Sequence, residues 1–236
     1  MGALFLTVAL CENMEYMPVI EFQDVVKKYK SGTVALDSLN FQINTGEFVF
    51  LIGPSGAGKS TVLKLLIREE KPSSGHVFVD EIDITKLPGR KIPKHRRKIG
   101  MIFQDFKLLP RKTVWENVSF SLEVSGQKTA DIRNKTTEVL SLVGLSEKAK
   151  LYPNQISGGE AQRAAIARAV VLNPKILLAD ETTGNLDHKN ATEVMSLLDK
   201  LNKLGTTIIM ATHKQEYVND EKHRVLNLQS GRIVNS

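Results

Sequence analysis

The stretch Gly-Pro-Ser-Gly-Ala-Gly-Lys-Ser at residues 53–60 follows an apolar run at residues 47–52 and leads into a helical pattern at residues 60–70. Its glycines let successive backbone N–H groups point at phosphate oxygens, and the N-terminal end of the helix favours the same anion. Lys59 is expected to reach the β and γ phosphates, and Ser60 to bind Mg²⁺. An accidental glycine turn before Lys-Ser is expected in only about one chain in a hundred. The stretch therefore predicts a nucleoside triphosphate site.

Apolar runs alternate with helical spacing along the rest of the chain. Continuous apolar runs predict strands buried on both faces, and helices between them predict a mostly parallel sheet in an α/β fold. The helical pattern at residues 112–150 interrupts that alternation as an insertion, and a small hairpin is expected near residues 229–232. The other expected strands are residues 19–22, 39–43, 77–79, 99–103, 176–179 and 206–211, and the other helices are residues 160–172 and 190–204.

The strand expected at residues 176–179 ends in two acids, Asp180 and Glu181. A buried strand that delivers Asp180 beside the phosphate loop supplies a partner for Mg²⁺, and Glu181 can then polarise the attacking water. Taken alone, such a pair is more often a helix cap or a solvated turn, but its pairing with the phosphate loop favours the chemical interpretation. GTP is not the expected nucleotide, because neither Asn-Lys pair, at residues 134–135 and 202–203, is followed by x-Asp.

A second anion site is indicated by Ser157-Gly158-Gly159-Glu160, which comes before the second acid strand. Ser157 stands at the N-cap position of a helix, and the two glycines leave room for a phosphate at the helix end. The alternative is a well-capped helix without a ligand.

These three motifs, in this order, resemble those of ABC-family ATPase subunits, and the resemblance runs from Met17 to the C-terminus. It implies a P-loop, RecA-like, mostly parallel sheet with an N-terminal antiparallel β subdomain and an inserted α-helical subdomain. Residues 17–104 and 163–236 are expected to form the β subdomain and the core. Residues 105–162 are expected to form the helical subdomain with the signature motif, and residues 1–16 a poorly ordered extension.

The resemblance also assigns site residues by their positions in the family motifs. Tyr29 resembles the aromatic that stacks on adenine, and Gln104 resembles the glutamine that senses Mg²⁺ and the attacking water. His213 resembles the switch histidine at the γ-phosphate, and Asp187 belongs to the loop that crosses the dimer seam. A surface histidine and a tyrosine that only packs are the alternatives. The expected catalytic residues are Glu181, His213, Gln104 and Lys59, and the expected metal ligands are Ser60, Gln104 and Asp180. The expected ATP contacts are Tyr29, Gly53, Pro54, Ser55, Gly56, Ala57, Gly58, Lys59, Ser60, Thr61, Ser157, Gly158, Gly159, Glu160 and Asp187.

In this family the signature motif closes over the γ-phosphate held by a second copy, so the resemblance implies a head-to-tail homodimer around two ATP molecules. ATP would favour the closed dimer, and hydrolysis would let it open. One departure from the family pattern is Thr182, where proline is common after the catalytic glutamate. Threonine does not fix φ, so the turn that aims Glu181 is expected to be looser and turnover slower.

The run from Asp180 to Asp187 is typical of the ABC branch that covers lipoprotein release, tripartite export and cell division, and residues 46–59 and 103–118 most resemble the cell-division members. This implies a four-span FtsX-type membrane partner, a peripheral place on the cytoplasmic face of the inner membrane, and control of peptidoglycan hydrolases. An ATPase of a lipoprotein-release or export transporter is the alternative. A soluble ATP-dependent scaffold or nucleic-acid factor is the other alternative, but no basic groove with interleaved aromatics supports nucleic acid.

Composition and charge exclude several classes of protein and locate the positive charge. The 236 residues include one cysteine, Cys11, which rules out an internal disulfide or a cysteine-based zinc site, and no apolar run is long enough to span a membrane. The formal charge is +6, but residues 86–98 hold seven basic residues and no acid, while the rest holds 25 basic against 26 acidic residues. A solvated helix face is the simpler interpretation of that segment. The sharper one is a contact with anionic lipid or with an acidic patch of the membrane partner.

Overall fold

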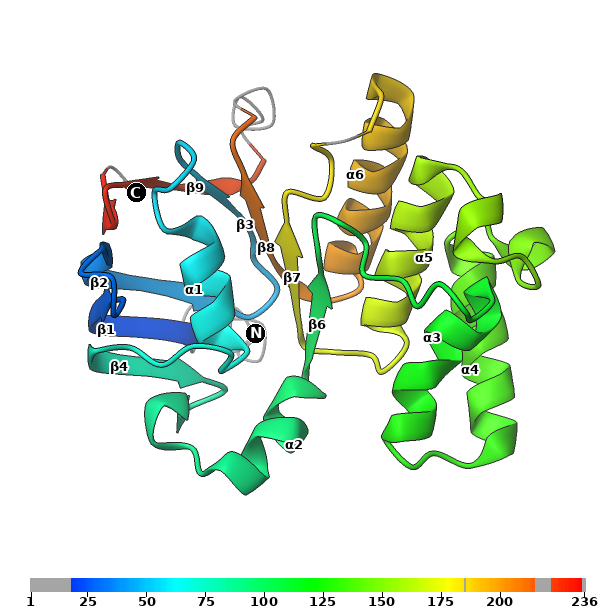
Figure 1. Cartoon of the computed structure of the whole chain (residues 1–236), viewed down its shortest axis with the longest axis horizontal. Helices are drawn as coiled ribbons and strands as arrows, with labels where there is room; N and C mark the ends of the chain where they lie inside the picture. Colours follow the sequence, from blue (N-terminus) through cyan, green and yellow to red (C-terminus); the bar gives the residue numbers. More distant parts are fainter. Residues whose placement is uncertain (1–17, 185, 215–221, 235–236) are drawn as a thin grey trace, which may run out of the picture.

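The computed structural model describes residues 18–184, 186–214 and 222–234, and Figure 1 shows their arrangement. The expected N-terminal extension at residues 1–16 and Asn185 lie outside the described residues. Two sheets that flank a helix occupy one side of the molecule, and a group of helices occupies the other. In the described part of the chain, no helix combines the length and apolarity needed to cross a membrane.

The smaller sheet is antiparallel, in the order β2-β1-β4-β5. Buried Ile20, Phe22 and Val25 of its long first strand belong to the same apolar cluster as the helix that follows the phosphate loop. The strand is longer than the four residues expected, and its register with both neighbours shifts near Asp24, which adopts a φ of 46°. The four strands are β1 (Pro18–Lys28), β2 (Val34–Asn44), β4 (Ser74–Val79) and β5 (Ile82–Asp83).

The larger sheet has six strands in the order β10-β9-β3-β8-β7-β6, and its five longest strands run parallel. Alternate residues point to opposite faces. In β3, for example, Val49 and Leu51 join one apolar cluster, and Phe48 and Phe50 join the other. Because parallel strands end at the same edge, this sheet gathers the residues that follow each strand. The strands are β3 (Phe48–Ile52), β6 (Ile99–Ile102), β7 (Ile176–Asp180), β8 (Thr207–Thr212), β9 (Arg224–Gln229) and β10 (Arg232–Ile233).

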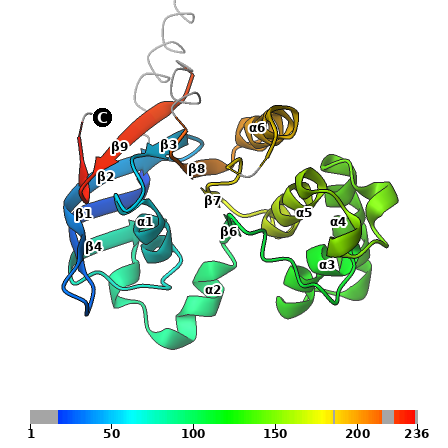
Figure 2. The same cartoon turned by 45° about the horizontal axis from the view of Figure 1, so that its top comes forward.

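Helices cover both faces of this sheet. Figure 2 shows α1 between the two sheets and α6 on the opposite face, with α3, α4 and α5 grouped beside the edge strand β6. The second cluster continues from the sheet into this group through residues such as Val118, Leu140 and Ala165. The helices are α1 (Lys59–Leu66), α2 (Ile92–Arg96), α3 (Val114–Val124), α4 (Thr129–Leu142), α5 (Gly158–Val170) and α6 (His188–Lys203).

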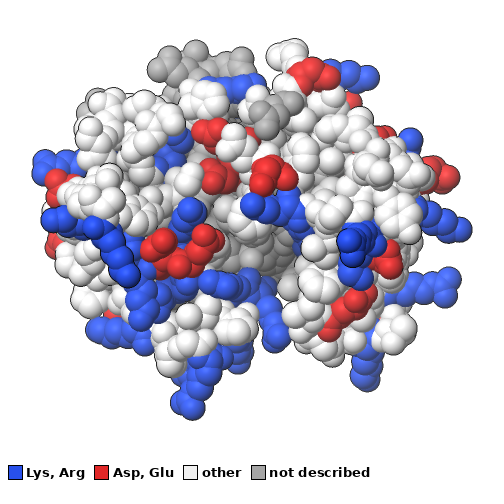
Figure 3. All heavy atoms as spheres, in the orientation of Figure 1, with Lys and Arg blue, Asp and Glu red and all other residues white. Residues whose placement is uncertain are grey.

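The basic segment at residues 86–98 forms short helical turns rather than one continuous helix face. A 3₁₀ turn at Gly89–Lys91 passes directly into α2, which precedes β6. Figure 3 shows that Lys and Arg side chains gather along the lower edge of the molecule, where Figure 1 places α2. The charge that the sequence concentrates in one segment therefore lies on one edge of the fold.

Candidate functional site

The phosphate loop joins β3 to α1 and is packed tightly against its surroundings. A side chain at Gly53 would overlap the backbone oxygen of Leu228, and one at Gly58 would lie 2.5 Å from the backbone oxygen of Ala35. Gly58 also has a φ of 108°, a conformation that side chains disfavour. The sequence needs glycine at both positions because neighbouring backbone leaves no space for a Cβ.

Lys59 is buried at the start of α1, with 5% of its surface exposed. Its Nζ donates hydrogen bonds to the carbonyl oxygens of Gly53, at 2.8 Å, and Pro54, at 3.0 Å. The ammonium group is therefore held over the loop by neutral acceptors, and its positive charge is available to an anion in the loop.

Ser60 and Asp180 meet although 120 residues separate them in the sequence. The Ser60 hydroxyl donates to Asp180 Oδ1 at 3.2 Å. Burial raises the pKa of Asp180, and the neighbouring Glu181 charge adds to that effect, although the hydrogen bond from Ser60 opposes it. Ser60 and Gln104 line the same cleft, and a hydroxyl, a carboxylate and an amide carbonyl are oxygen donors of the kind that Mg²⁺ prefers. A buried carboxylate of this kind is stabilised in its ionised form by a bound cation, so these residues fit Mg²⁺.

Glu181 follows β7, and its carboxylate lies beside a histidine that follows β8. The distance from Glu181 Oε1 to His213 Nδ1 is 3.1 Å. The Glu181 backbone has a φ of 48°, and its N–H donates to the Ala211 carbonyl at 2.9 Å. A left-handed conformation costs a non-glycine residue roughly 1 kcal/mol, and such outliers concentrate at functional sites. The next residue, Thr182, is buried with its hydroxyl 4.0 Å from Met210 Sδ.

A cleft of about 470 Å³ connects most of these groups. Tyr29 lies on its wall, where the hydroxyl is 3.3 Å from Thr61 Oγ1 and Lys27 Nζ lies 4.9 Å from the ring centroid. The structure thus brings Tyr29, the phosphate loop, Gln104 and Glu181, all predicted from the sequence, to one cleft. The lining residues are Tyr29, Thr33, Ala35, Ser55, Gly56, Gly58, Lys59, Ser60, Thr61, Gln104 and Glu181.

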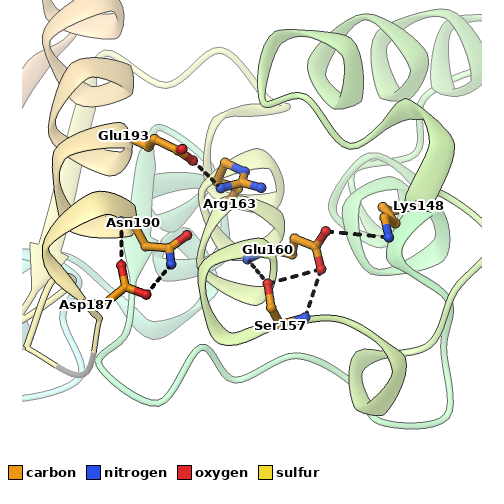
Figure 4. A network of polar contacts seen from close by, with 7 residues as sticks. All are labelled: Lys148, Ser157, Glu160, Arg163, Asp187, Asn190 and Glu193. Carbon is orange, nitrogen blue, oxygen red and sulfur yellow. Dashed lines mark hydrogen bonds and ion pairs between the residues drawn. The ribbon is translucent and has the colours of Figure 1, made fainter.

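The signature motif forms a separate polar network, drawn in Figure 4. Ser157 caps α5 by accepting from the Glu160 N–H at 3.3 Å, and Glu160 Oε2 accepts from the Ser157 N–H at 2.8 Å and from its hydroxyl at 3.1 Å. Lys148 lies 3.7 Å from the same carboxylate. The hydrogen bond that its carboxylate accepts from the Ser157 N–H lowers the pKa of Glu160, and the Ser157 hydroxyl and the Lys148 charge add to that effect, while partial burial opposes it. The helix end is therefore rigidly capped by its own side chains.

The same network connects α5 to α6. Arg163 Nη1 lies 2.8 Å from Glu193 Oε2, and a Cβ on Gly159 would overlap the Asn190 side chain. Asn190 Nδ2 in turn donates to Asp187 Oδ2 at 2.8 Å, and Asp187 caps α6. Five residues expected to contact ATP do not line the cleft of their own chain as the structure describes it. They are Ser157, Gly158, Gly159, Glu160 and Asp187.

Sequence reasoning missed Arg168, an arginine on α5 that reaches the segment after Gln104. Its Nη1 donates to the Lys107 carbonyl at 2.5 Å and its Nη2 to the Phe106 carbonyl at 2.7 Å. Phe106 and Lys107 have φ values of 58° and 50°, so the guanidinium holds two consecutive left-handed residues. Burial lowers the pKa of Arg168. The only signal in the sequence was a basic residue among the alanines of a helix.

Comparisons with known proteins agree with this architecture. Residues 36–184 match the family model described as "ABC transporter". The cell division ATP-binding protein FtsE of Streptococcus pneumoniae is 50% identical over 218 residues, covering 92% of this chain and 95% of the relative. FtsE of Mycobacterium tuberculosis is 52% identical over 217 residues, covering 92% of this chain and 94% of the relative.

A solved structure described as a dimeric post-hydrolysis state of the ATP-binding cassette MJ0796 bound to ADP and Pi superposes with a TM-score of 0.84. It is 39% identical and covers 92% of this chain and 97% of that chain. The fold expected from the motifs, an antiparallel β subdomain with a mostly parallel mixed sheet and helices, is thereby confirmed. The family model, these relatives and the shared fold together show that the chain belongs to the ABC transporter family of ATP-binding proteins, in the group of the cell division protein FtsE.

Proposed function

We propose that this ABC ATPase converts ATP hydrolysis into motion for an FtsX-type membrane subunit during cell division, and through it controls peptidoglycan hydrolases. The observation that carries the proposal is the cleft in which Lys59, Ser60 and Glu181 face the same space. Cell-division relatives near 50% identity over 92% of the chain support the cellular role. The protein would then act at the cytoplasmic face of the inner membrane as a peripheral subunit.

In this proposal the phosphate loop, residues 53–61, holds the phosphates of ATP while Tyr29 stacks on adenine. Ser60, Asp180 and Gln104 would hold Mg²⁺, which would neutralise negative charge on the phosphates when bound. Lys59 stabilises the negative charge that grows on the γ-phosphate.

Glu181 acts as the general base and takes a proton from the attacking water. His213, 3.1 Å from Glu181 Oε1, restricts the orientation of that carboxylate and would contact the γ-phosphate in the closed state. The left-handed backbone of Glu181, fixed by the hydrogen bond to Ala211, aims its side chain into the cleft.

The signature residues complete the site from a second copy. Ser157 and Gly158 are exposed at the end of α5, outside the cleft of their own chain, where a head-to-tail partner presents its own phosphate loop. The dimeric state named for MJ0796 with ADP and Pi supports this arrangement. We therefore propose that Ser157, Gly158, Gly159, Glu160 and Asp187 act across the interface of an ATP-bound homodimer.

A groove of about 430 Å³ beside α3 is the proposed docking place for the membrane subunit. Phe120 and Val124 expose apolar side chains there, at 39% and 58%, and Lys107 and Arg168 also line it. An apolar segment of the partner that carries acidic or carbonyl groups would match this lining. The groove lies between the core, residues 17–104 and 163–236, and the helical subdomain proposed at residues 105–162.

Steady-state ATP turnover of the complex tests the assignment of Glu181. Glu181→Gln removes the base but keeps the shape, so turnover should fall by about 100-fold or more. The matched control is Glu138→Gln, on the exposed surface of α4, which should leave turnover unchanged. Equal rates for wild type and Glu181→Gln would overturn the assignment.

Copurification under ATP-trapped conditions tests the partner. The chain should be retained by an FtsX-type subunit and not by the membrane subunit of a lipoprotein-release or export transporter. Retention by the latter alone would assign the chain to that alternative. Salt-sensitive DNA binding without either partner would instead support a nucleic-acid factor.

A further inference from the structure

Four of the seven cations in the basic segment already have structural partners. Lys86 lies 3.1 Å from Asp83, and Lys98 lies 3.1 Å from Asp80. Arg96 donates to the carbonyls of residues 67 and 68 at the end of α1, and Arg97 donates to the carbonyl of residue 124 at the end of α3. Cations stabilise the C-terminal ends of helices, so these arginines hold the fold together at two helix ends.

The other three cations, Arg90, Lys91 and Lys94, are exposed. Within the described part of the chain, the structure gives their side chains no ion pair or hydrogen bond. On one side the nearest acids in the sequence are Asp83, which is bonded to Lys86 and His76, and Asp80, which is bonded to Lys98 and Lys175. Glu81 lies between them and is exposed, and the structure gives it no ion pair with the three cations. No acid is present between Asp83 and Asp105. In the described part of the chain, none of the three cations is therefore paired with an acid.

Two of these cations, Lys91 and Lys94, border a partly apolar hollow. The cavity of about 270 Å³ has apolar walls from Val79, Ile82 and Leu87, and its polar lining is Lys91, Lys94, His95 and Lys98 with Asp80, whose carboxylate is already paired with Lys98 and Lys175. Ile82 exposes 46% of its surface although it is a large apolar residue. Apolar carbon beside unpaired ammonium groups matches an anionic amphiphile, whose charged headgroup meets the lysines while its hydrocarbon contacts the floor.

Docking of the membrane subunit in the proposed groove would place this cluster on the membrane side. Pro93, Arg96 and Arg97 line the groove assigned to the membrane subunit, while Lys91 and Lys94, from the same turns, line the apolar hollow. In Figure 3 the lower edge that includes this region is rich in Lys and Arg. A subunit docked in the groove would hold the neighbouring turn against the bilayer surface, so this step rests on the proposed docking groove.

We propose that Arg90, Lys91 and Lys94, with the apolar hollow beside them, form a site for the headgroups of anionic phospholipids. Each unpaired cation near such a surface strengthens binding by about fivefold, so the three together supply on the order of 100-fold. The contact would orient the ATPase beneath its membrane partner and would add affinity to the protein–protein contact without touching the nucleotide cleft.

Sedimentation of the full chain with vesicles tests the proposal. The wild type should bind vesicles of phosphatidylcholine with a quarter phosphatidylglycerol, bind less in high salt, and not bind phosphatidylcholine alone. The triple variant Arg90→Gln, Lys91→Gln, Lys94→Gln should lose on the order of 100-fold in binding. The matched control, Lys189→Gln, Lys200→Gln, Lys203→Gln on exposed positions of α6, changes net charge equally and should bind as the wild type does.

The decisive readout is whether the two triple variants differ in vesicle binding, because both carry three fewer positive charges than the wild type. Equal loss would show attraction by net charge alone and would overturn the site. A wild type that ignores anionic vesicles, while the first triple variant loses copurification with the membrane subunit, would overturn the lipid and identify an acidic protein face instead. ATP turnover of the same variants should equal that of the wild type, so failure of the lipid site is distinguishable from failure of the proposed ATPase function.

Charge reversal at Arg96, Arg97 and Lys98, in the same basic segment, would be a poorer probe. Those side chains bond to the ends of two helices and to Asp80, so their reversal would disturb the fold as well as the surface. The choice of Arg90, Lys91 and Lys94 separates lipid binding from stability.

Discussion

The phosphate-loop region and the signature region use polar side chains in opposite ways. Around the loop, hydrogen bonds join residues from different elements: Ser60 of α1 reaches Asp180 of β7, and His213 after β8 reaches Glu181 after β7. Around the signature, Ser157 bonds to Glu160 of its own helix, and Arg163 links that helix rigidly to α6. In the proposed function, the first region is a reaction site whose loop and acids come from one chain. The second is then a preformed edge that becomes part of a site when another copy meets it.

Mixing two inactive variants gives the largest effect that this comparison predicts. Lys59→Ala disables the loop and Ser157→Arg blocks the signature, so each complex alone should lose at least about 100-fold in turnover. In an equal mixture about half of the dimers are mixed, and each holds one site with an intact loop and an intact signature. Turnover should therefore recover to about a quarter of the wild-type value. Reconstituted complexes and a steady-state phosphate assay provide the measurement.

A second pair of variants is the control for that recovery. Lys59→Ala and Asp180→Asn both lie in the loop region, so every site in their mixed dimers carries one of the two lesions. Their mixture should stay as inactive as each variant alone. No recovery in the loop-signature mixture would show that the signature serves its own chain. Recovery in the control would show that Lys59 and Asp180 do not act in the same site.

The parts of the site that follow strand ends could be predicted from the sequence, because a strand, a turn and the next residue form a local pattern. Gly58, Lys59 and Glu181 were found in this way. Long-range side-chain bonds leave no such pattern. Arg168 reaches a carbonyl 62 residues earlier, and Arg163 reaches an acid 30 residues later. The sequence likewise does not show which cations of residues 86–98 have partners, because Lys98 bonds to Asp80 and Arg96 and Arg97 bond to the ends of two helices that are distant in the sequence.

Arg168 is the residue that connects the two compared regions, and its loss should have the second largest effect. It extends from α5 to the carbonyls of Phe106 and Lys107, just after Gln104. Arg168→Gln should lower kcat by about tenfold, because hydrogen bonds from a charged donor contribute roughly 1.5–3 kcal/mol. KM for ATP should change little, since the loop itself is intact. Arg168→Lys keeps the charge but cannot donate to both carbonyls with the geometry of a guanidinium, so it should restore only part of kcat.

A structural role alone would move a different quantity for Arg168. If the side chain only stabilises the fold, the variants would lower the denaturation midpoint while kcat per folded molecule stays normal. That result would remove Arg168 as a positioning residue for Gln104.

Neighbouring glycines of the signature provide a smaller and purely steric test. A Cβ at Gly159 overlaps Asn190, which holds Asp187, whereas a Cβ at Gly158 meets no atom within 4 Å. Gly159→Ala should therefore destabilise the monomer by about 1–2 kcal/mol through overpacking. Gly158→Ala should leave it unchanged or slightly more stable. Urea denaturation of both variants provides the measurement, and equal midpoints would contradict the close contact between α5 and α6.

Thr182 tests how firmly the loop region holds its base, and it should give the smallest effect. Glu181 already has a φ of 48°, and Thr182 is 2% exposed. Its N–H has no hydrogen-bond acceptor among the residues that the structure describes, so Thr182→Pro would remove no bond while restricting the chain. The turn should stiffen, raising turnover by about twofold and stability by up to about 1 kcal/mol.

The opposing influence is the proline ring, which disfavours helical backbone angles at the residue before it. Thr182→Ala separates the two effects because it removes the hydroxyl without adding a ring. If both variants speed turnover equally, the hydroxyl near Met210 is what slows the reaction. If only Thr182→Pro does so, backbone freedom at Glu181 is the limiting feature, and the loop region is less rigid than the signature edge it meets. A slower Thr182→Pro would show instead that the left-handed Glu181 cannot tolerate proline in this chain.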